Sequence, residues 1–109
     1  MPNRYSIAAN ASATDASETE LVAAPGAAKA INICNLTLSN TSATAEFVDI
    51  KFGSTVKLQK VPVPAGLGVV INLGDKPLLL PANTALNFQA TTGVSTLYAN
   101  CTYFLNPNG

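Results

Sequence analysis

The stretch AINICNLTLSNTSATAEFVDIKFG, residues 30–53, decides the fold. In its first half Cys34, Leu36 and Leu38 alternate with polar residues, which is the period of a half-buried β-strand. A turn at 40–42 follows, because short polar side chains there can hydrogen-bond their own backbone. The second half repeats the alternation, with one face formed by Glu46, Val48, Ile50 and Phe52. The stretch therefore predicts two strands joined by a polar turn.

The rest of the chain repeats this pattern in short segments, each bounded by turn residues. Proline cannot donate to a strand ladder, so the segment VPVP at 61–64 is expected at a sheet edge or in a crossover, and with Lys57 and Lys60 it opposes unwanted edge-to-edge pairing. A hairpin is expected at 91–93, before a last strand over 95–105. Seven or eight short strands at this spacing predict an all-β fold, an antiparallel β-sandwich or jelly roll.

Two parts are expected along the chain: an extended N-terminal arm over residues 1–18 and one β-sandwich domain over residues 19–109. The arm is rich in Ala, Ser, Asn and Thr, and its only sizeable apolar side chains are Tyr5 and Ile7. Ordering such a segment costs about 1–2 kcal/mol per residue in backbone entropy. Contact with a neighbouring subunit is therefore favoured over the alternative that the arm runs back along its own domain.

Composition excludes several partners. Charged residues make up 11% of the 109 residues and the formal net charge is zero, so no electrostatic footprint for nucleic acid or an anionic membrane is present. No apolar stretch has the ~20 residues of a transmembrane helix. The N-terminus lacks the apolar core of a signal peptide, so synthesis in the cytoplasm is expected. A charge-poor surface favours a chain that is packed among others.

No candidate for chemistry emerges, so we expect no enzyme, no metal site and no cofactor. The chain has no histidine, which removes the usual neutral-pH base and metal ligand. Glu46 and Asp49 are three positions apart on one strand, so they point to opposite faces and cannot act as a pair. Cys34 and Cys101 are expected to be buried free thiols, with an inter-strand disulfide as the open alternative.

Apolar side chains on the outer face of the last strand suggest a contact surface instead. Tyr98 and Phe104 alternate with core positions, and Phe47 joins them if it lies opposite the core. With Tyr5 and Ile7 of the arm, these residues are the candidate interface between subunits. The alternative is that the arm itself covers this face.

Five segments in order carry a family resemblance: APGAAKAINICNLTLSNTS, IKFGSTVKL, VPVPAGLGVVINL, LLLPANTALNFQA and VSTLYANCTYFL. Their succession of turns and strands, over roughly residues 20–105, resembles small β-sandwich proteins of tailed-bacteriophage virions. It is a pattern of turns and strands, and it transfers no functional residue.

The resemblance implies a structural protein of the virion. It points to a capsid decoration, or cement, protein that is made in the bacterial host cytoplasm and lies on the capsid surface. Its implied partners are the major capsid protein and neighbouring copies of itself, in a homo-oligomer, with no nucleic acid and no membrane. A neck or tail module, such as a tail-tip or fibre part, is the first alternative, and a glycan-binding module is the second.

Overall fold

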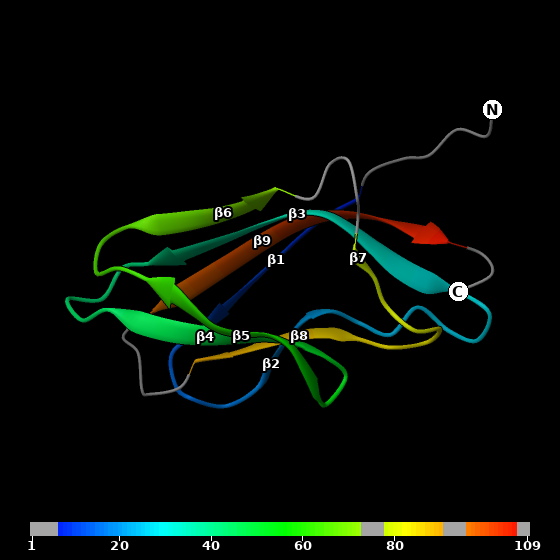
Figure 1. Ribbon diagram of the computed structural model, residues 1–109, viewed down its shortest axis with the longest axis horizontal. Coiled ribbons are helices and arrows are strands. Elements are labelled where there is room, and N and C mark those ends of the chain that lie inside the picture. The colour runs from blue at the N-terminus through cyan, green and yellow to red at the C-terminus, as the bar shows by residue number, and fades with distance from the viewer. Residues whose placement is uncertain (1–6, 73–77, 91–95, 107–109) are drawn as a thin grey trace.

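Two antiparallel sheets make up the protein, as the computed structural model shows for residues 7–72, 78–90 and 96–106 (Figure 1). Sheet A contains, in spatial order, β1 (Ile7–Ala13), β9 (Leu97–Asn106), β3 (Ala30–Asn40) and β6 (Gly68–Asn72), and β7 (Leu78–Leu79) also pairs with β3. Sheet B contains β2 (Thr19–Val22), β8 (Leu86–Ala90), β4 (Glu46–Phe52) and β5 (Thr55–Val63). The prediction of an all-β antiparallel sandwich is confirmed.

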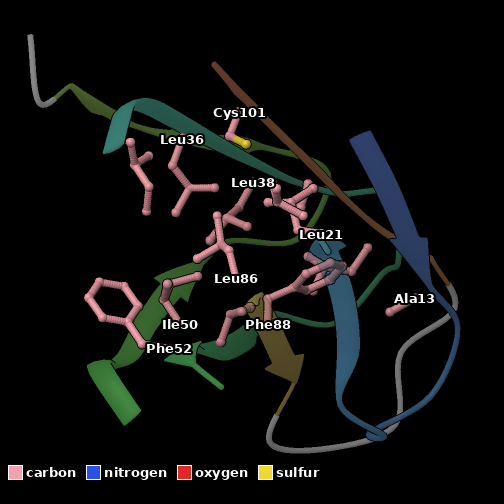
Figure 2. Packing of buried hydrophobic residues seen from close by; sticks show 14 of the residues in the cluster. Ala13, Leu21, Leu36, Leu38, Ile50, Phe52, Leu86, Phe88 and Cys101 are labelled. Carbon is pink, nitrogen blue, oxygen red and sulfur yellow. The ribbon is translucent and has the colours of Figure 1, made fainter. Parts of the chain in front are cut away.

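The core lies between the two sheets and follows the predicted alternation (Figure 2). Leu36 and Leu38 of sheet A face Ile50 and Phe88 of sheet B, and all four are 1% exposed or less. The predicted inward face of β4 is confirmed, because Glu46, Val48, Ile50 and Phe52 are all buried. The same period puts Asp49 on the other face, so the two carboxylates do not meet.

The polar turn at the centre of the chain does not close a hairpin. It crosses the sandwich, since β3 belongs to sheet A and β4 to sheet B. The hairpin expected at 91–93 lies outside the described residues, but β8 pairs with β2 and β4 and not with β9. Alternation in the sequence shows which side of a strand is buried. It does not show whether the next strand joins the same sheet or the opposite sheet, because the alternation is the same in both cases.

The N-terminal stretch differs from the predicted arm. Residues 7–13 form β1, an edge strand that pairs continuously with β9 from Ile7↔Tyr103 to Ala13↔Leu97. Ala13 is buried, and Ala9 and Ala11 pack against the core. The chain here runs along its own domain, because a backbone ladder and small methyl groups at the margin of the core hold it without large apolar side chains. Tyr5 lies outside the described residues.

The proline-containing segment is part of an edge strand, as predicted. β5 is the outer strand of sheet B, and its pairing with β4 has register shifts on both sides of Ile50. Lys60 adopts a positive φ of 51°, and its backbone N–H donates to the Asp49 carboxylate at 2.8 Å. The register shifts twist the edge strand and the lysine adds charge to it, and both features oppose pairing with a strand of another molecule.

Both cysteines are free thiols in the structure, but only Cys101 is buried as predicted, whereas Cys34 is half-buried. Cys34 is the extra residue where the register of β3 shifts against β9, between Ile33 and Asn35. Cys101 points into the core near Leu36 (Figure 2) and is 5% exposed. Burial, reinforced by the neighbouring Cys34 thiol, raises the pKa of Cys101 from 9.0 to about 11.

We expect alkaline pH to destabilise the fold through Cys101. Between pH 9 and pH 11 the unfolded chain loses the thiol proton while the folded chain keeps it, so the free energy of unfolding falls as pH rises. A shift of this size corresponds to about 2–3 kcal/mol across the window. Urea unfolding across this pH range should show a smaller loss in Cys101→Ala than in the unaltered chain. An identical loss in both chains would show that Cys101 is not the cause.

Candidate functional site

Charge is distributed unequally between the two sheets. The described strands of sheet A contain no charged residue. Every charged strand residue belongs to sheet B: Glu20, Glu46, Asp49, Lys51, Lys57 and Lys60. The sandwich therefore has one ionic side and one neutral side, although its net charge is zero.

The outer surface of sheet A is a neutral face of small polar side chains. Cross-strand register places Asn10, Asn100, Thr37 and Val70 in one row across β1, β9, β3 and β6. The neighbouring rows add Ala8, Thr102 and Asn35 on one side, and Ser12, Tyr98 and Ser39 on the other. We call these ten residues the neutral face.

A shallow hollow of about 180 Å³ lies on the neutral face. Its polar lining consists of amides and hydroxyls from three adjacent strands, contributed by Asn10, Asn35, Thr37, Asn100 and Thr102. Such groups can donate and accept hydrogen bonds without the desolvation cost of a charge. The neutral face is therefore suited to contact with another polar, uncharged surface.

The two aromatic residues predicted for this face do not form one patch. Tyr98 is 45% exposed and belongs to the neutral face, whereas Phe104 is half-buried. They lie six positions apart on β9, which corresponds to about 20 Å along a strand. Asn100 and Thr102 occupy the outward positions between them. The surface is thus less apolar than the sequence suggested.

The other predicted interface residues lie elsewhere. Phe47, 48% exposed, is on the outer face of sheet B, opposite Pro62 of β5. Ile7, 39% exposed, is at the start of β1 in register with Tyr103. The structure therefore does not bring Ile7, Phe47, Tyr98 and Phe104 together.

One ion pair on sheet B belongs to a small network of polar contacts. Lys51 Nζ lies 2.8 Å from Glu18 Oε1 and donates to Gln89 Oε1 at 3.1 Å. Gln89 Nε2 in turn donates to the carbonyl oxygen of Ala16 at 2.9 Å. These contacts fasten the connection between β1 and β2 onto sheet B, so this charge cluster has a structural role.

An apolar groove of about 440 Å³ opens between the sheets. Its walls are Phe52, Lys57 and the segment 78–81, and Lys57 Nζ lies 5.9 Å from the centre of the Phe52 ring. The groove suits an apolar side chain, and among the described residues that line it Lys57 is the one titratable group.

No three His, Cys, Asp or Glu side chains that could hold a metal ion gather in the described part of the chain. No helix in residues 7–72, 78–90 and 96–106 is long and apolar enough to cross a membrane. What sequence reasoning missed is the neutral face, because its polar residues were taken as an ordinary solvent side. The available signal was the lack of charge over 30–40 and 97–106.

No protein-family model matches the sequence, and no curated protein matches it. Among solved structures, the fold is similar to a chain in the acidic stable capsid structure of Helicobacter pylori bacteriophage KHP30. The superposition has a TM-score of 0.64 at 13% sequence identity and covers 91% of this chain and 86% of that chain. This likeness independently supports the β-sandwich fold.

Proposed function

We propose that this protein is a structural component of a tailed-bacteriophage particle, specifically a capsid decoration protein that strengthens the head by binding across shell subunits. Its partners are the major capsid protein and neighbouring copies of itself, and its place is the capsid surface. It acts by surface contact and catalyses no reaction.

One observation carries this proposal: the likeness to a chain of a phage capsid extends over almost the whole of both chains. Because the aligned part is a similar share of each, the two chains have nearly equal lengths. The likeness is thus between two small single-sandwich chains.

The neutral face is the surface that we assign to the shell contact. Burying a charge at an interface is costly unless it is paired, and the centres of protein interfaces are depleted of charged residues. The neutral face has no charge to desolvate, and Tyr98 gives it one exposed aromatic side chain, a residue type enriched at interfaces. Many such weak contacts, repeated by lattice symmetry, add up to a stable layer.

The alternatives receive less support. A neck or tail module would use the same sandwich, and no specific contact on the described surface favours it. A glycan-binding module would present neighbouring aromatic rings, but Tyr98 and Phe104 are about 20 Å apart on β9.

Shell binding by charge-introduction variants tests the assigned surface. Tyr98→Glu and Val70→Glu each place a carboxylate on the neutral face, at positions 45% and 66% exposed. Matched controls are Phe47→Glu and Val56→Glu on sheet B, 48% and 43% exposed. On particles that lack this protein, we expect the first pair to weaken binding at least about tenfold and the controls to have little effect.

The opposite ranking would assign the contact to sheet B and overturn the choice of face. If the unaltered, folded chain does not bind these particles, the decoration role itself is wrong.

A further inference from the structure

The edge strands of the sandwich are protected to different degrees. An unpaired edge presents free N–H and C=O groups, and proteins usually guard such edges with charge, proline, bulges or short length. β5 carries Lys57, Lys60 and Pro62 together with register shifts. β2 has only four residues and contains Glu20, and its register against β8 shifts between Glu20 and Val22.

The edge formed by β1 has none of these protections. It runs for seven residues, Ile7–Ala13, without a charge, a proline or a break in register. β6, at the other side of sheet A, is five residues long. β1 is therefore the longest unguarded edge among the described strands, on the sheet that also lacks charge.

We propose that β1 is a self-association surface, where β1 of a second copy pairs with it antiparallel about a two-fold axis at Asn10. Sheet A would then continue from one copy into the other. This inference concerns the edge of sheet A, which shares Ala8, Asn10 and Ser12 with the neutral face, and it stands whether or not the protein decorates a capsid.

The sequence of β1 fits this pairing. With Asn10 on the axis, Ala9 lies opposite Ala11 of the second copy, Ala8 opposite Ser12, and Ile7 opposite Ala13. The one large side chain, Ile7, thus lies opposite the small Ala13, so the pairing creates no steric clash. The exposed Ile7 gains apolar cover from this arrangement, and the two Asn10 amides can hydrogen-bond across the axis.

The same surface is used by both copies, as a closed two-fold interface requires. Small side chains contribute little buried area, so we expect association in solution to be weak and to strengthen where copies are held close together. The row containing Asn10, Asn100 and Thr37 would extend into its counterpart and double the width of the neutral face.

Disulfide trapping tests the register. Directly opposite Cα atoms in an antiparallel pair are about 4.5–5.5 Å apart, within disulfide range. Asn10→Cys should therefore give a cross-linked dimer under mild oxidation, located by mass spectrometry at the new cysteine. The control is Asn100→Cys on the same face one strand inward, where the two copies are separated by three strand spacings, about 14 Å, and no cross-link is expected.

Charge variants at Asn10 test specificity. Asn10→Lys and Asn10→Asp each place like charges opposite one another and should raise the dissociation constant of the dimer at least about tenfold. Mixing the two variants should restore association, as measured by sedimentation. Thermal unfolding checks that each variant is folded.

Absence of an Asn10→Cys cross-link, or a dimer unaffected by Asn10→Lys, would overturn the proposal.

Discussion

Replacing Asn40 by leucine should lower the free energy of unfolding by about 3–5 kcal/mol, because the change removes a buried side chain whose hydrogen bonds join three parts of the chain. Asn40 is 1% exposed. Its Nδ2 donates to the carbonyl oxygens of Thr44 at 2.8 Å and Val63 at 3.2 Å. Its Oδ1 accepts from the Ser42 backbone N–H at 2.9 Å and from the Ser42 hydroxyl. One side chain thus joins β3, the crossing turn and β5 of the opposite sheet.

Leucine has a similar size but satisfies none of these groups. Each buried donor or acceptor left without a partner costs about 1–3 kcal/mol, which is a large share of the 5–15 kcal/mol that stabilises a typical domain. Urea unfolding measures the difference. The neighbouring control is Thr41→Val, which removes an exposed hydrogen bond to the Thr96 carbonyl and should cost less than about 1 kcal/mol. Equal losses in the two variants would contradict this role of Asn40.

Phe88→Ala should destabilise the protein by about 3–5 kcal/mol, through lost burial and the cavity left behind. Phe88 is fully buried at the centre of β8 and lies between the sheets among the core side chains (Figure 2). Phe47→Ala makes the same chemical change on the neighbouring β4 of sheet B, but Phe47 is 48% exposed on the outer face. We expect its cost to be within about 1 kcal/mol.

Phe88→Ala and Phe47→Ala change the same residue type in the same sheet, so the difference between their stabilities measures the effect of burial. Thermal or urea unfolding of both variants gives the result. If Phe47→Ala were the more damaging change, the assignment of inner and outer faces to β4 and β8 would be wrong.

Sequence periodicity predicted the elements well because a strand buried on one side must alternate. The shared face of Glu46, Val48, Ile50 and Phe52 on β4 agrees with the structure, and so do the core positions that alternate with Tyr98 on β9. The proline rule placed β5 at an edge. These features depend on local chemistry, which a single sequence contains.

Pairing between strands could not be predicted in the same way. The turn after Asn40 has hairpin chemistry, yet it crosses between the sheets, and Asn40 itself hydrogen-bonds to Val63 of β5 in the opposite sheet. Likewise β1 has too few large apolar side chains to be recognised as a strand of the core. Its position depends on the ladder with β9, a long-range interaction that leaves no local pattern.

The candidate surface was predicted only in part. The sequence identified Tyr98 as outward, and the structure agrees. It grouped Phe47 with Tyr98 because alternation gives the side of each strand but not the sheet to which the strand belongs. The neutral face depends on which strands are neighbours, so it became visible only when the topology separated charged from uncharged strands.

We proposed a role in a phage particle, and the copy number of this chain in purified particles of the proposed phage tests this central claim most directly. Quantitative mass spectrometry against the major shell protein gives the ratio. A decoration protein should be present in numbers comparable with the shell protein. A count matching only one or a few rings would contradict decoration and indicate the neck or tail, and absence from the particle would contradict any structural role in the virion.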